Sequence, residues 1–261
     1  MYIIALLFTT LRYFSFFKIK FPNLFVANLF SMFNSDITPG KSGFISIVFS
    51  LKKRDITYNE STMALGVTQF LDFLIRGIII IMAGVIIIKF FNFPIYWVAL
   101  LIVITFIFVI VLFLLIYTRI ISKITKRFPK RQFLQKISLF FENVHERATS
   151  HKKKIPLLLL YSILSWIFTT LRWAFCAYAL GINIPIYYAL ILQPIIAISA
   201  FIPFTIAGLG ITESLALLIL LPLGIEPEAI IALALLDRVI ALVVDMFGLI
   251  ELKWFLGKKK K

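Results

Sequence analysis

Residues 9–13 read TTLRY and residues 169–173 read TTLRW, so one arginine-bearing motif occurs twice within apolar sequence. An ionisable side chain at the centre of a bilayer costs about 2.5–3.5 kcal/mol on insertion scales, so such an arginine normally faces a partner or a wet cavity. Four pairs of landmark residues keep nearly constant spacing: Arg12 and Arg172, Pro22 and Pro185, Pro39 and Pro203, Asp72 and Asp237. This spacing predicts two copies of one unit; chance recurrence of a short motif is the alternative.

The composition is that of an integral membrane protein. The 261 residues are 61% hydrophobic, include 28 Phe and have a mean hydropathy of +1.02, which is more apolar surface than a soluble domain of this size buries. No early stretch has the features of a removable signal peptide, so residues 2–17 are expected to remain as a helix. Cys176, His145 and His151 are too few for a disulfide framework or a metal site. We therefore expect no metal and no cofactor.

The net charge of +15 is concentrated in one segment. Residues 119–154 hold eleven Lys and Arg residues against only Glu142 and Glu146. A basic block beside membrane spans is typical of the cytoplasmic side, where it also meets anionic lipid headgroups. Nucleic-acid binding is not expected, because apolar segments enclose the block on both sides.

Apolar runs set the expected spans. Runs long enough to cross a bilayer core, about 20 residues, cover residues 61–90, 95–117, 155–180 and 228–255, and a shorter one covers 2–17. Two further apolar stretches, 22–50 and 186–222, are interrupted by TPGKSG at residues 38–43 and by PFTIAGLG at residues 203–210. Proline removes a backbone donor and glycine weakens a helix, so each stretch is predicted to form a hairpin of two short helices.

The lysine-rich ends agree with one topology. With residues 119–154 and the C-terminal lysines, 258–261, in the cytoplasm, the first hairpin enters from the cytoplasm and the second from outside. Inverted repeats with discontinuous helices are typical of secondary transporters. The predicted fold is an all-α polytopic integral membrane protein with two inverted helix, broken-hairpin, helix repeats, plus a linking span and an amphipathic cytoplasmic helix.

We interpret residues 1–261 as a single transmembrane domain in the plasma membrane. It comprises a first repeat (1–90), a linking span with the basic amphipathic segment (91–154) and a second repeat (155–257). Within the basic segment, residues 130–150 place apolar side chains at helical spacing opposite charged ones. They predict a helix on the cytoplasmic leaflet, and a linker helix packed on the protein is the alternative.

Several ionisable residues lie in or beside apolar spans. Asp72 and Arg76 are four residues apart, so they can form an ion pair on one helix face. Such a pair would serve either in gating or in holding the structure together. Arg12 and Arg172, related by the repeat, would converge on one anionic group such as a phosphate. The alternative is that each arginine reaches an interface or pairs with a carboxylate to hold helices together. Asp237 and Arg238 are candidates for a further gating or structural ion pair.

The two breaks carry different chemistry. Gly208 and Gly210 precede a short helix whose first amides would attract an anion. Glu213, in its first turn, could instead cap those amides itself. The first break carries Lys41 between Pro39 and Gly43.

Four stretches, in order, resemble one known family: Asn28 with PGKSG (Pro39, Gly40, Lys41, Ser42 and Gly43), LGVTQFLDFLIRG at 65–77, PFTIAGLGITE at 203–213, and LGI at 223–225 with Arg238 beyond it. They are similar to the transmembrane, flippase-like domain of lysylphosphatidylglycerol synthases and their stand-alone relatives. The resemblance covers nearly the whole chain, and GLGITE is its most specific part. It implies a membrane domain that moves a charged phospholipid between leaflets, while a separate soluble domain charges the lipid from aminoacyl-tRNA. These 261 residues include no such soluble domain, so lysyl transfer is not expected.

This sequence departs from the family pattern at two places. Phe44 follows Gly43 where an acidic residue is often seen, and Thr68 with Gln69 replaces the usual Glu-Arg before Asp72. Typical relatives also begin one helix earlier. These departures bear on which substrate is moved.

The predicted function is translocation of an anionic phospholipid or a polyprenyl-phosphate-linked lipid, without enzymatic activity. Candidate headgroup ligands are Arg12, Arg172, Gly208, Gly210 and Glu213. One alternative is a non-transporting partner subunit of a lipid-modifying enzyme or a glycosyltransferase. A membrane-embedded lipid transferase is a second, although the spans contain no nucleophile with a base and no paired carboxylates with a histidine.

Overall fold

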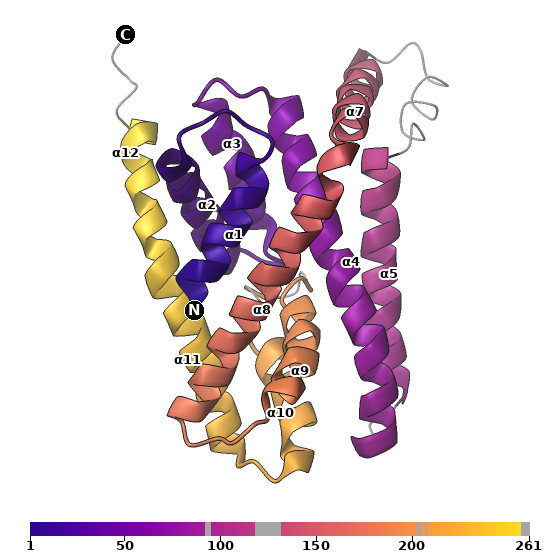
Figure 1. Ribbon diagram of the computed structural model, residues 1–261, viewed down its shortest axis with the longest axis vertical. Helices are drawn as coiled ribbons and strands as arrows, with labels where there is room; N and C mark the ends of the chain where they lie inside the picture. The colour runs from indigo at the N-terminus through magenta and orange to yellow at the C-terminus, as the bar shows by residue number, and fades with distance from the viewer. Residues whose placement is uncertain (92–94, 118–131, 203–204, 207, 257–261) are drawn as a thin grey trace.

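The computed structural model describes residues 1–91, 95–117, 132–202, 205–206 and 208–256, and these residues are built from helices (Figure 1). Pro203, residues 119–131 of the basic block and the terminal lysines lie outside the described residues. The first-half helices are α1 (Tyr2–Phe14), α2 (Phe21–Asp36), the 3₁₀ turn η1 (Ser42–Ile45), α3 (Ser46–Lys52), α4 (Tyr58–Phe91) and α5 (Ile95–Tyr117). The remainder are α7 (Gln132–Ser150), η2 (Lys152–Lys154), α8 (Ile155–Ala179), α9 (Ile186–Ser199), α10 (Ile211–Leu220), η3 (Leu221–Leu223), α11 (Pro227–Asp245), η4 (Met246–Ile250) and α12 (Glu251–Leu256).

Two of these helices are long and apolar enough to cross a membrane. They cover Tyr58–Ile81 and Lys152–Ala179 among the described residues, and shorter apolar helices surround them. Large apolar side chains are exposed along several elements; for example, Phe106 is 48% exposed, Val239 54% and Phe247 64%. Such a surface is far more apolar than water tolerates and fits contact with lipid tails.

Both predicted breaks are present. After α2 the chain turns through Gly40 and Lys41, whose φ angles of 56° and 55° are left-handed and so exclude a right-handed helix at these positions. After α9 it turns again through Gly208 (φ 77°) and Gly210 (φ 83°). Each apolar stretch therefore folds as two short helices around a kinked turn.

The tips of the two hairpins meet in the middle of the molecule. In Figure 1, α2 and α3 occupy the upper half, while α9 and α10 occupy the lower half. Pro39 and Ile206 form an isolated antiparallel bridge between the tips. The Phe44 ring stacks on the Phe201 ring, with centroids 6.0 Å apart. The two broken segments thus close the centre of the fold from opposite ends.

The helices that carry the two TTLR motifs, α1 and α8, pack side by side (Figure 1). Phe8 and Phe168 stack between them, with ring centroids 5.7 Å apart. Each of these phenylalanines directly precedes its TTLR motif. The repeated sequences are therefore in direct contact with each other.

The predicted span at 228–255 is not one continuous α-helix. α11 ends at Asp245, and the chain tightens into η4 before α12 begins. The reason is close packing on α2: a Cβ on Gly248 would lie 2.2 Å from the backbone nitrogen of Phe30. The tight turn brings the bare glycine backbone against that helix.

The amphipathic helix α7 packs on the protein, which is the arrangement of the linker-helix alternative. Val144 and Ala148 are buried in one cluster with Met63 and Leu71 of α4 and Leu158 of α8. This contact covers one stripe of α7, while Leu139 on the same helix remains 60% exposed.

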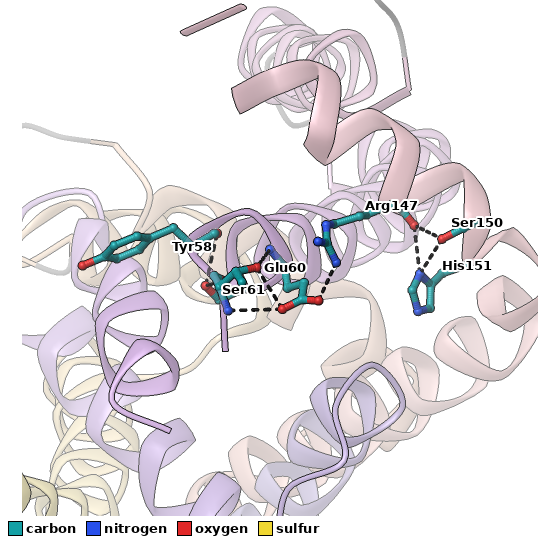
Figure 2. A network of polar contacts seen from close by, with 7 residues as sticks. Tyr58, Glu60, Ser61, Arg147, Ser150 and His151 are labelled. Carbon is teal, nitrogen blue, oxygen red and sulfur yellow. Dashed lines mark hydrogen bonds and ion pairs between the residues drawn. The ribbon is translucent and has the colours of Figure 1, made fainter. Parts of the chain in front are cut away.

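A polar network fixes the end of α7 to the start of α4 (Figure 2). Glu60 accepts hydrogen bonds from the Thr57 backbone amide (3.1 Å) and hydroxyl (2.8 Å), which caps α4, and it also pairs with Arg147. Nδ1 of His151 lies 2.8 Å from the backbone carbonyl oxygen of Arg147. The His151 ring also packs against the Phe16 ring, with ring centroids 5.4 Å apart. The network joins the ends of α1, α4 and α7.

Candidate functional site

A cavity of about 230 Å³ lies between the two halves of the chain. Side chains from α1, α2, α4, α8, α9, α10 and α11 line it, so it sits where the hairpin tips meet the long helices. Its charged lining residues are five cations and three carboxylates: Arg12, Lys41, Arg76, Arg172, Arg238, Asp36, Asp72 and Asp237. An excess of cations in a small cavity favours an anionic occupant.

Arg12 is almost fully buried, at 3% exposure, and is held on two sides. Its Nη1 donates to an oxygen of Asp72 on α4 and to the hydroxyl of Ser162 on α8, the latter at 2.9 Å. Asp72 thus pairs across helices with Arg12, and no ion pair joins it to Arg76 among the described residues. This ion pair connects α1 with α4.

Arg172 makes the corresponding pair in the second half. Its Nε and Nη2 donate to the two oxygens of Asp237 at 2.7 and 2.8 Å, a bidentate arrangement. The guanidinium also lies over the Tyr2 ring, 4.2 Å from its centroid. Both repeated arginines therefore already have a carboxylate partner.

Glu213 caps its own helix. Its Oε2 accepts a 2.7 Å hydrogen bond from the Gly210 amide, while its Oε1 lies 3.1 Å from Nη2 of Arg238. The amides of Ile211 and Thr212 donate to the Gly208 carbonyl at 3.0 and 2.9 Å. The first amides of α10 are thus occupied within the turn, and Arg238 pairs with Glu213.

The residues of the first hairpin divide between cavity and scaffold. Lys41 lines the cavity, with its Nζ 3.0 Å from Asp36 Oδ1. Asn28 is fully buried and donates to the hydroxyls of Thr9 (2.8 Å) and Thr10 (3.1 Å), which ties α2 to the TTLR motif.

Close backbone packing explains the glycine at position 43. A Cβ there would lie 2.2 Å from the backbone of Asn34. Neither Gly43 nor the neighbouring Pro39 and Gly40 lines the cavity. Gly208 and Gly210 likewise shape the second turn and are absent from the cavity wall.

Arg76 differs from the other cavity cations. Within the part of the chain that the structure describes, it makes no hydrogen bond or ion pair; its guanidinium faces the Phe201 ring, 6.0 Å from the centroid. Three more donors of the cavity-lining residues, Arg12 Nε, Trp166 Nε1 and Arg172 Nη1, are buried without an acceptor. Unsatisfied donors call for an acceptor-rich occupant such as a phosphate.

Sequence reasoning did not find several residues of this wall. Tyr2, Ser162 and Trp166 line the cavity but lie in long apolar runs without local partners. Asp36 could have been identified from the sequence as a partner of Lys41, since it lies five residues before Lys41, just ahead of the predicted break. Among the described residues, no group of three or more His, Cys, Asp and Glu is placed to hold a metal ion.

Comparison with known proteins identifies the family of the chain. No curated protein matches the chain, and no solved structure does. The family described as Lysylphosphatidylglycerol synthase TM region matches residues 1–247, which include the cavity residues and both hairpins. The chain is therefore a membrane protein with a lipid-related role, and it belongs to the Lysylphosphatidylglycerol synthase TM region family.

Proposed function

We propose that this protein translocates an anionic phospholipid or a polyprenyl-phosphate-linked lipid between leaflets, without acting as an enzyme. The observation that carries the proposal is the cavity, whose wall has more cations than carboxylates and unsatisfied donors. A lipid phosphate offers both the negative charge and the acceptors that this wall lacks. Membership of a lipid-related membrane family supports the same class of substrate.

Arg76 is the headgroup ligand in this proposal. Arg12, Arg172 and Arg238 already face carboxylates, so recruiting any of them would break an ion pair. Arg76 loses no partner on binding a phosphate, and it lies beside Phe201 at the tip of the second hairpin. Arg12 and Arg172 then act mainly through the helix contacts that their ion pairs hold.

The architecture proposed for this activity is a pair of inverted repeats. Three features support it: corresponding Arg–Asp pairs occur in both halves, Phe8 stacks on its counterpart Phe168, and the hairpins approach from opposite ends. Such halves can exchange their packing around a fixed site and open it to each leaflet in turn. We further propose that the lysine-rich end of the molecule faces the cytoplasm at the plasma membrane, where residues 119–154 meet anionic headgroups.

The test is leaflet exchange of fluorescent lipids in proteoliposomes, with anionic and zwitterionic lipids compared. We expect faster exchange of phosphate-bearing anionic lipids than in empty vesicles. Arg76→Gln should slow it about ten- to a hundredfold, because hydrogen bonds to charged groups contribute about 1.5–3 kcal/mol. Arg76→Lys should retain part of the rate, and Arg147→Gln, which removes an arginine outside the cavity, should retain all of it.

Two results would contradict the proposal. Exchange equal to that of empty vesicles for every lipid would favour the partner-subunit role instead. Exchange that is fast but unchanged by Arg76→Gln would remove Arg76 as the ligand and return attention to Arg172.

A further inference from the structure

Asp245, the last residue of α11, is a buried carboxylate with only half of its hydrogen bonding satisfied. Its side chain is 0% exposed. The Tyr2 hydroxyl donates to its Oδ2 at 2.7 Å, whereas its Oδ1 is buried and has no partner in the described part of the chain. A buried ionised carboxylate normally requires a cation or several donors.

The charges around Asp245 are already balanced without it. The charged groups that interact with it electrostatically are Asp36, Lys41 and Arg172, from α2, the following turn and α8. Lys41 pairs with Asp36 at 3.0 Å, and Arg172 pairs with Asp237, on the same helix as Asp245, through two hydrogen bonds. An ionised Asp245 would therefore be the one unmatched negative charge in this group.

We propose that Asp245 is a proton-binding site and that its proton is linked to the charge in the cavity. A neutral carboxylic acid makes the whole group neutral, and burying an unsatisfied neutral oxygen costs far less than burying an unpaired charge. Tyr2 joins the site to the cavity, because its hydroxyl contacts Asp245 and the residue also lines the cavity wall. Asp245 takes up its proton from water onto a carboxylate oxygen and releases it to water again. Tyr2 lies between Asp245 and the cavity and marks the route of this exchange.

The link to the cavity rests on the function proposed above. An anion bound in the cavity, whose wall includes Tyr2 and Arg172, adds negative charge on the side of Asp245, which favours the protonated acid. By reciprocity, the protonated acid strengthens anion binding by the same factor. Anion affinity should therefore be highest at low pH and should fall as the pH rises and Asp245 loses its proton.

The proton itself is tested by infrared spectroscopy on the full chain in lipid nanodiscs. At neutral pH, wild type should show a protonated-carboxyl band that is absent in Asp245→Asn. Removing the exposed carboxylate in Glu228→Gln should leave that band unchanged. Tyr2→Phe should keep the band but shift it to higher frequency, because the hydrogen bond to the acid is lost.

The Tyr2 variant also decides the case if Asp245→Asn fails to fold. A band that persists in Asp245→Asn, or that does not move in Tyr2→Phe, overturns the proposal. These spectra require no transport, so they remain informative even if no lipid is exchanged.

The linkage has its own measurement, the affinity for short-chain phosphatidylglycerol, whose phosphodiester does not titrate near neutral pH. Between slightly acidic and alkaline pH the affinity should fall for wild type and stay constant for Asp245→Asn. Equal pH dependence in both overturns the linkage. Absence of binding at every pH counts instead against the proposed function, while the infrared result stands.

Discussion

Arg172 shows how an arginine is retained within an apolar helix. Its side chain is 11% exposed, and its charge is met by two hydrogen bonds to Asp237 and by the Tyr2 ring. Removing both charged groups of such a pair can be nearly neutral, because their desolvation cost disappears with their attraction. Removing only one leaves the other charge buried without a partner.

This asymmetry predicts the stability of variants at the pair. Asp237→Asn should lower the free energy of unfolding by about 1–3 kcal/mol or more, since it leaves a buried charge unsatisfied. Replacing both residues with apolar ones, Arg172→Met with Asp237→Leu, should recover most of that loss. Unfolding by denaturing detergent measures all three proteins.

The exposed pair Glu60–Arg147 provides the matched control, with side chains 31% and 42% exposed. Breaking it with Glu60→Gln should cost about 0–1 kcal/mol, as is usual for solvated ion pairs. Equal costs at the two pairs would show that the Arg172–Asp237 pair is as well hydrated as a surface pair.

At the residue scale the sequence identified the charged groups better than their partners. Arg12, Asp72, Arg76, Arg172, Asp237 and Arg238, which stand out in the apolar runs, line the cavity, whereas Asp245 does not. The partner of each charged group could not be predicted from neighbouring residues in the sequence. Asp72 lies four residues from Arg76, yet it binds Arg12, sixty residues away. Helical spacing permits a contact, but packing of distant helices selects it.

Among the elements, the two hairpin turns are the parts that meet at the centre. Proline and glycine in the breaks predicted both turns from sequence, because these residues cannot continue a helix without cost. The contact between the turns was not predictable from their composition. It depends on the Pro39–Ile206 bridge and the Phe44–Phe201 stack, which join segments from different halves.

This contact predicts a specific cross-link. Residues opposite each other in an antiparallel bridge have Cα atoms about 4.5–5.5 Å apart, which suits a disulfide. In a Cys176→Ala background, Pro39→Cys with Ile206→Cys should form an intramolecular disulfide on mild oxidation. Leaflet exchange should stop in the cross-linked protein and return on reduction, if the tips must separate for a lipid to pass.

The control for the cross-link pairs Pro39→Cys with Leu209→Cys, which is similarly exposed but does not bridge Pro39. It should remain a dithiol under the same conditions. A slow disulfide in both pairs would indicate that the tips move widely. Exchange that continues through a complete Pro39–Ile206 cross-link would show that the tips need not separate.

The helix ends show what local sequence leaves out. The end of α11 at Asp245 follows from the approach of Gly248 to α2, and the buried pair of Arg54 with Glu251 then ties α12 to the end of α3. The second of these contacts spans almost two hundred residues. The pattern of apolar residues within 228–255 indicates neither the approach of Gly248 to α2 nor the Arg54–Glu251 pair. The sequence therefore predicted a single span over residues 228–255.

At the scale of the whole molecule, the distribution of lysine predicts which end faces which side. In Figure 1 the α3–α4 connection and α7 lie at the upper end, while the α8–α9 connection and the start of α11 lie at the lower end. The upper end carries the lysines at 52, 53 and 152–154, whereas the lower end carries Glu226 and Glu228. The positive-inside rule therefore predicts that the upper end faces the cytoplasm.

Single cysteines test this assignment in a Cys176→Ala background, with a membrane-impermeant maleimide applied to intact cells. Asn183→Cys and Glu228→Cys, both exposed at the lower end, should be labelled at once. Asp55→Cys and Thr149→Cys, exposed at the upper end, should be labelled only after the membrane is permeabilised. Since the two hairpins enter from opposite ends, this pattern places the first hairpin on the cytoplasmic side and the second outside. The reverse pattern would turn the molecule over but keep the hairpins opposed, whereas labelling of all four sites in intact cells would contradict a fixed transmembrane arrangement.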